Sequence, residues 1–401
     1  MDIIYKFIKV QLFVTFLIIL ISSCSDNDNN PVESEESGRG VVINTENTAN
    51  VTTEGIQLLV NSIATSAPIT LKYDVQVYSI DYYTIDAKNN EQIASGALFV
   101  PKGQTNMPLV SIQHGTETKS NAVASVNYLN SFEGVGGLVF ASLGYLTVVP
   151  DYLGFGVSNV DHPYMHANSL TPCIVDFIRA AKNFSTRKEI VLNEDVFLAG
   201  YSEGGYLTLA AQKDIELNYT SEINLKAIAP MAGPYDFKGT VDSILVDGEY
   251  STPYYVAYVL KSYDEIYAWN RLNDFFQSPY NTTVSSLLNG SKEYDVVVSQ
   301  LPSTLKELLK NEFISNYNNG KETELENVLD ENSLLNWTPT TPIHFFHGNA
   351  DEVVPYDNAL KAVAEFSSKG ADVKLTTIFG GTHSTSVTSS MIGAIEWFET
   401  F

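Results

Sequence analysis

Short apolar runs alternate with helical stretches along most of the chain after Tyr73. Several runs are continuously apolar and rich in β-branched residues, as expected of strands that are buried on both faces of a sheet. The pattern predicts an α/β fold with a mainly parallel eight-stranded sheet flanked by helices, in which the first two strands form an antiparallel hairpin. The predicted strands are Val75–Ile85, Gln92–Val100, Leu109–Gln113, Tyr145–Val149, Val196–Ala199, Leu225–Ala229, Ile343–Phe346 and Lys374–Phe379.

The segment between the sixth and seventh predicted strands has no strand periodicity. It contains helical stretches such as Leu305–Phe313, and its first part is dense in tyrosine, tryptophan and phenylalanine. We interpret residues 234–340 as a helical cap, or lid, inserted into a core made of residues 49–233 and 341–401. Most of the aromatic side chains are expected to pack the cap against the core, and the others can line a pocket.

The N-terminus has the order of a signal peptide, because the apolar run Leu12–Ile21 follows a positively charged start and precedes Ser22-Ser23-Cys24. This run is shorter than the roughly 20 residues of a spanning helix, and an uncleaved anchor is the alternative. Ile21-Ser22-Ser23-Cys24 resembles the lipobox of bacterial lipoproteins. The resemblance implies that residues 1–23 are removed and that lipidated Cys24 holds the protein to a membrane.

Residues 24–48 are rich in Ser, Asn, Asp and Glu and poor in apolar residues, which predicts a disordered tether. The acidic residues directly after Cys24 resemble the signal by which some Gram-negative bacteria export lipoproteins to the cell surface. We therefore expect an outer-membrane lipoprotein at the cell surface, with a periplasm-facing position as the alternative. Cys173 is the only other cysteine, so the mature chain is expected to have no internal disulfide.

Composition narrows the possible partners. The chain has 401 residues and is 44% hydrophobic, which is enough to bury a large core. Its formal net charge is −24, and such a surface repels nucleic acid and anionic lipid headgroups. Nucleic acid is therefore not expected as a partner, and a neutral or cationic small molecule fits better. The alternative is that the acidity only keeps an exposed protein soluble.

The stretch Gly200-Tyr201-Ser202-Glu203-Gly204 matches the pattern G-x-S-x-G. It follows the apolar run Val196–Ala199 and precedes a helical stretch, which is the strand-turn-helix context of a nucleophile elbow. A serine hydroxyl becomes a good nucleophile only when a base takes its proton and an anion orients that base. In this context the chain order is Ser, then Asp or Glu, then His.

Three histidines follow Ser202. His344 lies inside an apolar strand and His347 at the end of that strand, where core and turn-shaping roles are favoured. His383 alone lies in a loop after the last predicted strand, at the carboxyl edge that faces the elbow. We predict that His383 is the catalytic base.

The acid is expected just after the penultimate strand, in the sequence from His347 to Pro355. We predict Asp351 for this role, with its neighbour Glu352 as the competitor. Glu352 is expected to face the other way if the loop turns into a helix near Pro355. The predicted catalytic residues are therefore Ser202, Asp351 and His383.

An oxyanion hole needs two backbone N–H donors, one from the residue after the serine and one from the loop after the third strand. The first donor is predicted to be Glu203. The second is predicted to be Thr116, in the loop His114-Gly115-Thr116, and its hydroxyl can serve as a third donor.

Several motifs together resemble the secretory-lipase (lipase A-like) family of α/β-hydrolases, over about residues 70 to 401. They are His114-Gly115-Thr116, the stretch Pro150-Asp151-Tyr152-Leu153-Gly154-Phe155-Gly156, Gly200-Tyr201-Ser202-Glu203-Gly204-Gly205, His347-Gly348-Asn349-Ala350-Asp351, and His162-Pro163-Tyr164 followed by Asp176 and Arg179-Ala180-Ala181. The resemblance implies an α/β-hydrolase fold with a lid, cleavage of carboxylic esters, and a structural role near the site for Asp151.

These features predict an esterase or lipase that forms an acyl-enzyme on Ser202 and needs no metal or cofactor. Its expected substrate is a small ester, either an acyl lipid or an acylated carbohydrate. Two alternatives are a serine peptidase of aminopeptidase type on the same fold and a non-catalytic surface-binding lipoprotein. The second alternative predicts broken motifs, and the sequence contains none.

Overall fold

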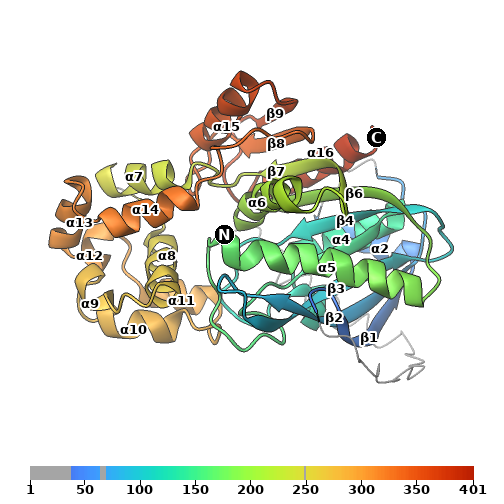
Figure 1. Cartoon of the computed structure of the whole chain (residues 1–401), viewed down its shortest axis with the longest axis horizontal. Helices are drawn as coiled ribbons and strands as arrows, with labels where there is room; N and C mark the ends of the chain where they lie inside the picture. The colour runs from blue at the N-terminus through green and yellow to red at the C-terminus, as the bar shows by residue number, and fades with distance from the viewer. Residues whose placement is uncertain (1–37, 64–68, 248–249) are drawn as a thin grey trace.

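The computed structural model describes residues 38–63, 69–247 and 250–401 (Figure 1). The predicted signal peptide and the predicted lipidation at Cys24 lie outside these residues. Nine strands form one sheet in the spatial order β1-β2-β3-β5-β4-β6-β7-β8-β9. The first three neighbouring pairs in this order, as far as β3-β5, are antiparallel, and all the following pairs, from β5-β4 to β8-β9, are parallel. The strands are β1 (Val42–Val51), β2 (Val75–Ile85), β3 (Glu91–Pro101), β4 (Met107–Gln113), β5 (Leu146–Pro150), β6 (Leu192–Tyr201), β7 (Asn224–Met231), β8 (Ile343–Gly348) and β9 (Val373–Ile378).

Strand β1 corrects two predictions. The sheet has nine strands instead of eight, and residues 42–48 are not part of a disordered tether because they pair with β2. β1 is an edge strand in which half of the residues are exposed and only Val42 is buried, so its Thr and Asn residues need no apolar surroundings. The chain just before it is also held, because the Arg39 guanidinium lies 3.0 Å from the buried Asp176 carboxylate. Polar composition therefore concealed a strand that backbone hydrogen bonds stabilise.

Helices cover both faces of the sheet and enclose two apolar clusters. On one face lie α5 (Ala167–Arg187), α6 (Glu203–Asn218) and α15 (Asp357–Ser368) (Figure 1). On the other face lie α2 (Thr53–Ile63), α4 (Phe132–Leu143) and α16 (Val387–Phe398), and the short α3 (Ala124–Asn127) packs near β3. Central strands such as β5 are buried along their whole length. This two-sided burial explains their continuous apolar runs.

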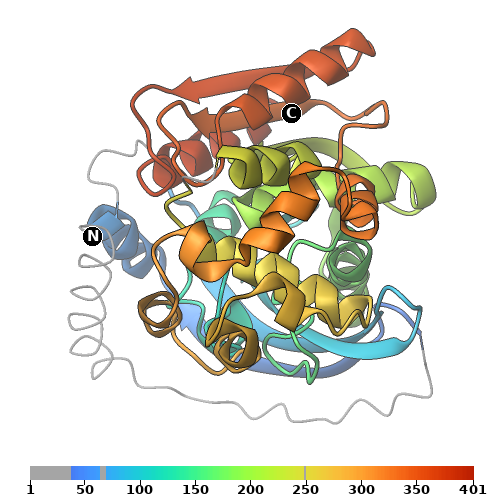
Figure 2. The ribbon, with the colours of Figure 1, turned by 90° about the vertical axis from the view of Figure 1, so that its left-hand side faces the viewer.

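Helices α7 to α14 follow one another between β7 and β8 and lie together at one end of the sheet, as the two ribbon views show (Figures 1 and 2). Their interior belongs to the same apolar cluster as α5 and α6. The predicted helix over Leu305–Phe313 is interrupted, because Leu309 is extended and bridges to Phe276. The helices are α7 (Phe237–Asp247), α8 (Pro253–Ile266), α9 (Leu272–Phe275), α10 (Tyr280–Leu287), α11 (Tyr294–Gln300), α12 (Leu305–Leu308), α13 (Asn311–Asn318) and α14 (Thr323–Glu331).

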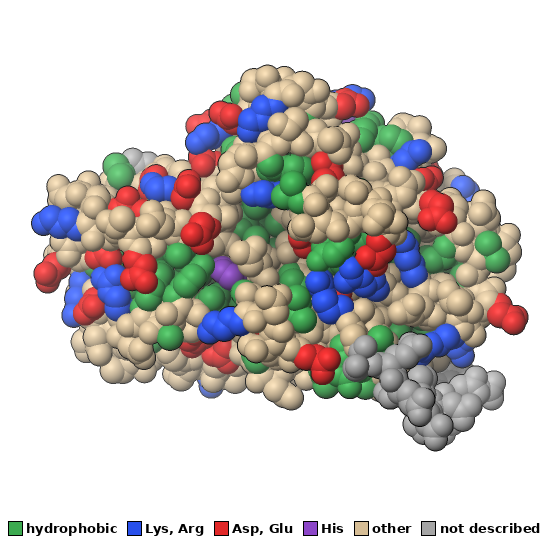
Figure 3. Space-filling view, in the orientation of Figure 1, with side chains coloured by type: hydrophobic (Ala, Val, Ile, Leu, Met, Phe, Trp, Pro, Cys, Tyr) green, Lys and Arg blue, Asp and Glu red, His purple; other side chains and the backbone are tan. Residues whose placement is uncertain are grey.

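The surface carries charges of both signs. On the face drawn in Figure 3, basic side chains lie among acidic ones and neutral surface. Across the described ranges, none of the helices is long and apolar enough to cross a membrane.

Cys173 is a free, buried thiol, and burial raises its pKa to about 12. Residues 38–63, 69–247 and 250–401 therefore contain no disulfide.

Candidate active site

Ser202 occupies the sharp turn between β6, which ends at Tyr201, and α6, which begins at Glu203. Its backbone has φ 60° and ψ −119°, a conformation that costs a residue with a side chain of order 1–3 kcal/mol. The flanking glycines permit the turn, since a Cβ at Gly200 would collide with the Gly204 carbonyl. The Ser202 N–H donates to the Met231 carbonyl at 2.9 Å, which fixes the turn to β7.

The imidazole of His383 lies between the two other predicted catalytic side chains. Its Nε2 is 2.9 Å from Ser202 Oγ, and its Nδ1 is 2.7 Å from Asp351 Oδ2. A carboxylate only accepts, so Nδ1 carries the proton and Nε2 is free to accept the Ser202 proton. The Tyr201 hydroxyl donates to the His383 carbonyl at 2.6 Å and so holds the loop that carries the ring.

Asp351 is fixed by four donors. Its Oδ1 accepts from the N–H groups of Val353 and Val354, each at 2.9 Å, and its Oδ2 lies 3.2 Å from His347 Nε2 as well as near His383. Burial opposes ionisation of Asp351, but the hydrogen bonds from His347 and His383 outweigh it and lower the pKa of Asp351. The carboxylate is therefore ionised at neutral pH. His347 also contacts the Val354 carbonyl at 3.0 Å, in line with its predicted turn-shaping role.

Glu352 does not face away from the site, and that prediction is wrong. Its Oε2 accepts from the backbone N–H of His383 at 3.2 Å, because the loop after β9 folds back over the loop after β8. The imidazole itself contacts Asp351. The structure thus brings both carboxylates to His383 and assigns them to different atoms of that residue.

The loop after β4 runs beside the nucleophile. A Cβ added at Gly115 would lie 4.0 Å from the Ser202 Cβ, and the Gly115 N–H donates to Oε1 of buried Glu133 at 3.1 Å. In the part of the chain that the structure describes, the N–H groups of Glu203 and Thr116 donate to no other protein group. The Thr116 hydroxyl lies 2.8 Å from the Tyr164 hydroxyl. The Glu203 N–H, directly after Ser202, and the Thr116 N–H, directly after Gly115, are therefore without a protein acceptor in the described residues.

The side chain of Glu203 is a feature that the sequence reasoning missed. It is fully buried, and its Oε1 lies 2.9 Å from His162 Nε2. His162 is held in turn by the Leu153 carbonyl, 2.8 Å from Nδ1. The sequence did contain a signal for a role of this side chain: Glu203 is the one acidic residue in Gly200-Tyr201-Ser202-Glu203-Gly204 and directly follows the nucleophile. Only the fold shows that His162 pairs with it.

The other predicted residues take structural positions. Asp151 is buried just after β5 and accepts from the Ser95 hydroxyl at 2.6 Å and from the Ser125 N–H at 3.2 Å, so it joins β3 and α3 and has a structural role near the site. Glu117, which follows Thr116 in the chain, was not among the predicted residues. Its carboxyl is buried, and this burial, followed by the charges of Glu133 and Glu203, raises the pKa of Glu117 to about 8. Within residues 38–63, 69–247 and 250–401, no group of three or more His, Cys, Asp or Glu side chains is placed to hold a metal ion.

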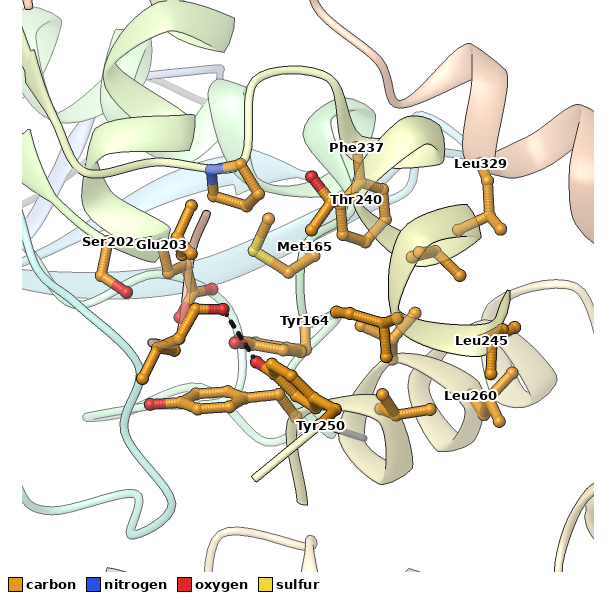
Figure 4. Close-up of a pocket in the computed structure, with 18 of the residues that line it drawn as sticks. Tyr164, Met165, Ser202, Glu203, Phe237, Thr240, Leu245, Tyr250, Leu260 and Leu329 are labelled. Atoms are coloured by element: carbon orange, nitrogen blue, oxygen red, sulfur yellow. Dashed lines mark hydrogen bonds between the residues drawn. The ribbon is translucent and has the colours of Figure 1, made fainter. Parts of the chain in front are cut away.

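A pocket of about 690 Å³, its mouth included, extends from Ser202 and Glu203 into the cap. Figure 4 shows these two residues at one end and Leu245, Leu260 and Leu329 at the other. Most of the lining is aliphatic or aromatic. The complete lining is Tyr164, Met165, Ser202, Glu203, Pro234, Phe237, Thr240, Val241, Ile244, Leu245, Tyr250, Tyr255, Val256, Val259, Leu260, Leu325, Leu329, Val353 and Val354.

A mostly parallel sheet with a serine on a strand-to-helix turn, and with an acid and a histidine on the loops after the last two strands, defines the α/β-hydrolase class. The comparison with protein families gives the particular group. The secretory lipase family model matches residues 138–400, more than half of the chain, and the chain belongs to this family. The family and the fold predicted from the sequence are thus confirmed.

Individual relatives agree with this placement. The chain is 26% identical over 249 residues to the secreted triacylglycerol lipase LIP1 of Malassezia furfur, a match that covers 60% of this chain and 48% of that protein. The chain spans about half the length of the curated relatives that it matches. The rice cell wall degrading esterase LipA from Xanthomonas oryzae is 28% identical, with a TM-score of 0.80 over 90% of this chain and 97% of that one. A protein from Legionella pneumophila is 25% identical, with a TM-score of 0.82 and the same coverage.

Proposed function

We propose that the chain is a carboxylic ester hydrolase that uses Ser202, His383 and Asp351 as a catalytic triad. The observation that carries the proposal is the single imidazole that contacts Ser202 Oγ through Nε2 and Asp351 Oδ2 through Nδ1. Membership of the secretory lipase family supports ester hydrolysis as the reaction. The esterase from Xanthomonas oryzae supports it further, because it shares the fold over nearly its whole length.

The reaction would proceed in two acyl-transfer steps. His383 Nε2 takes the Ser202 proton while Oγ attacks the ester carbonyl, and the N–H groups of Glu203 and Thr116 hold the oxyanion. The tetrahedral intermediate collapses when the C–O bond to the alcohol breaks and the His383 proton passes to the departing oxygen. Water then attacks the acyl-enzyme with His383 again as base, which releases the acid and restores Ser202.

The pocket beside Ser202 supports the assignment of an acyl site. Its lining is largely aliphatic, and leucine side chains surround its far end in the cap (Figure 4). Burial of an alkyl chain in such a pocket is favourable by about 0.8 kcal/mol for each CH₂ group. We therefore propose that the acyl chain enters the cap and that the alcohol part stays near the opening. Acyl lipids and acylated carbohydrates both satisfy this arrangement. Both are worth testing, because one relative is a triacylglycerol lipase and another is a cell wall degrading esterase.

A fluorophosphonate probe tests the chemistry directly. The probe should label the wild-type chain once, on Ser202, and Ser202→Ala should remove the label. Chromogenic acyl esters and aminoacyl amides assayed side by side separate an esterase from a peptidase, and we expect turnover of the esters. Labelling of another residue, or turnover of the amides alone, would contradict the proposal.

We also propose that the chain is exported and lipidated at Cys24, because the lipobox-like sequence precedes this residue and the matched Malassezia lipases are described as secreted. Expression in a Gram-negative host with labelled palmitate should give a labelled protein in the membrane fraction. Cys24→Ser should lose the label and accumulate as the precursor, whereas the matched variant Cys173→Ser should keep the label. A soluble, unlabelled wild-type chain would exclude lipidation. Accessibility to added protease in intact cells would distinguish the cell surface from the periplasmic face.

A further inference from the structure

Glu203 lines the start of the pocket and has one carboxylate oxygen with no partner in the described residues. Its side chain is fully buried, its Oε1 contacts His162 Nε2, and its Oε2 has no hydrogen-bond partner in the described residues. A buried carboxylate oxygen without a partner costs free energy, so such an oxygen is usually satisfied when a ligand is bound. The feature therefore points to a polar group on the substrate.

The hydrogen bonds of His162 determine what Oε2 can do. The Leu153 carbonyl only accepts, so the proton on His162 lies at Nδ1. The contact between Nε2 and Glu203 Oε1 must then contain one further proton, held by either atom. In both cases Oε2 carries no proton and can only accept. Its partner must be a donor, such as a hydroxyl or an amine.

The position of Glu203 determines where on the substrate that donor lies. Glu203 lines the same pocket as Ser202, and the two residues lie together at one end of it (Figure 4). Three other hydroxyls of the lining already have partners, since Thr240 donates to the Asp236 carbonyl at 2.8 Å, Tyr250 donates to the Val353 carbonyl at 3.1 Å, and Tyr164 lies 2.8 Å from the Thr116 hydroxyl. Beyond this end the lining is mostly apolar. A donor that reaches Oε2 must therefore be borne within the first few carbons from the scissile carbonyl.

We propose that Glu203 is a specificity-determining residue that accepts a hydrogen bond from a hydroxyl on the acyl chain, at the second or third carbon. The inference rests on the proposed ester hydrolysis and names a class of substrate, the short hydroxyacyl ester. The remainder of the acyl chain would extend into the aliphatic part of the pocket. An unsubstituted acyl chain would leave Oε2 without a partner and would be a poorer substrate.

The test uses butyrate, 2-hydroxybutyrate, 3-hydroxybutyrate and 3-methoxybutyrate esters of one alcohol, with the full chain. The wild-type kcat/KM should be higher for at least one hydroxy ester than for butyrate, and 3-methoxybutyrate should not share this preference because it cannot donate. Glu203→Met removes the acceptor at similar volume. It should lower the ratio of the kcat/KM for the preferred hydroxy ester to that for butyrate by about ten- to a hundredfold, the cost of leaving a buried hydroxyl without its acceptor.

Glu203→Gln is the matched variant. Its amide NH₂ can donate to His162 Nε2, which leaves the amide oxygen where Oε2 lies in the wild type. The ratio of kcat/KM for the preferred hydroxy ester to kcat/KM for butyrate should therefore stay higher in Glu203→Gln than in Glu203→Met. Both esters are assayed with the same variant, so a loss of activity that affects them equally does not change the ratio of their kcat/KM values. Equal kcat/KM for hydroxy and methoxy esters in the wild type, or equal ratios in the wild type and Glu203→Met, would overturn the inference while ester hydrolysis stands. Hydrolysis of none of the esters would overturn both proposals.

Discussion

Replacement of Ser202 with alanine is expected to lower kcat for esters by about 10⁶-fold, the loss measured when a triad nucleophile is removed elsewhere. The physical reason is that His383 Nε2, 2.9 Å from Oγ, then has no hydroxyl from which to take a proton. The backbone donors and the pocket would remain and account for the residual rate. Alanine adopts a φ of 60° no more readily than serine, so the strain of the turn is nearly unchanged.

Steady-state kinetics on a short acyl ester, together with thermal unfolding, checks this expectation. Ser299→Ala is the matched control, since Ser299 is exposed on α11 and, within the described part of the chain, its hydroxyl bonds only to the Val296 carbonyl of the same helix. The control should retain wild-type kcat, and both variants should unfold within a few degrees of the wild type. Retention of most of the activity in Ser202→Ala would refute the assignment of the nucleophile.

Asp351→Asn is expected to lower kcat by about 10⁴-fold. The amide would leave the geometry nearly intact, but it could present NH₂ to His383 Nδ1 and favour the tautomer that cannot accept the Ser202 proton. It would also remove the negative charge that stabilises the imidazolium. The low pKa of Asp351 means that this charge is present throughout the neutral range.

Glu352→Gln supplies the comparison for Asp351. Glu352 is exposed, and among the described residues it accepts a hydrogen bond from the backbone N–H of His383, which an amide oxygen can also accept. The kcat of Glu352→Gln should therefore differ from the wild-type value by less than about tenfold. Measurement of kcat for the two variants on one ester decides between the carboxylates. A larger loss in Glu352→Gln than in Asp351→Asn would make Glu352 the acid.

Apolar runs located most of the sheet because its central strands are buried on both faces. The predicted strand Val75–Ile85 coincides with β2, and the other predicted strands overlap β3 to β9. β1 was not predicted, since an edge strand with exposed Thr and Asn residues carries little apolar signal. The break at Leu309 was also missed, because it depends on a bridge to Phe276, a residue far away in the sequence.

For the site, the sequence predicted the residues whose chemistry depends on chain order. The structure brings Ser202, His383 and Asp351 together, as the order Ser, Asp, His after successive strands requires. It also places Glu352 on the His383 backbone, and it pairs Glu203 with His162. These contacts arise from the way loops fold over one another, which no local pattern encodes.

The ion pair between Arg39 and Asp176 has a consequence for where this protein can work. It ties the chain to the folded domain only 15 residues after Cys24. Even a fully extended chain covers no more than 3.6 Å per residue, so the segment from a lipidated Cys24 to the domain would be at most about 54 Å long. With Cys24 lipidated as proposed, the enzyme could not act on substrates far from the bilayer. Its substrates would have to be delivered to, or produced in, a thin layer next to the bilayer.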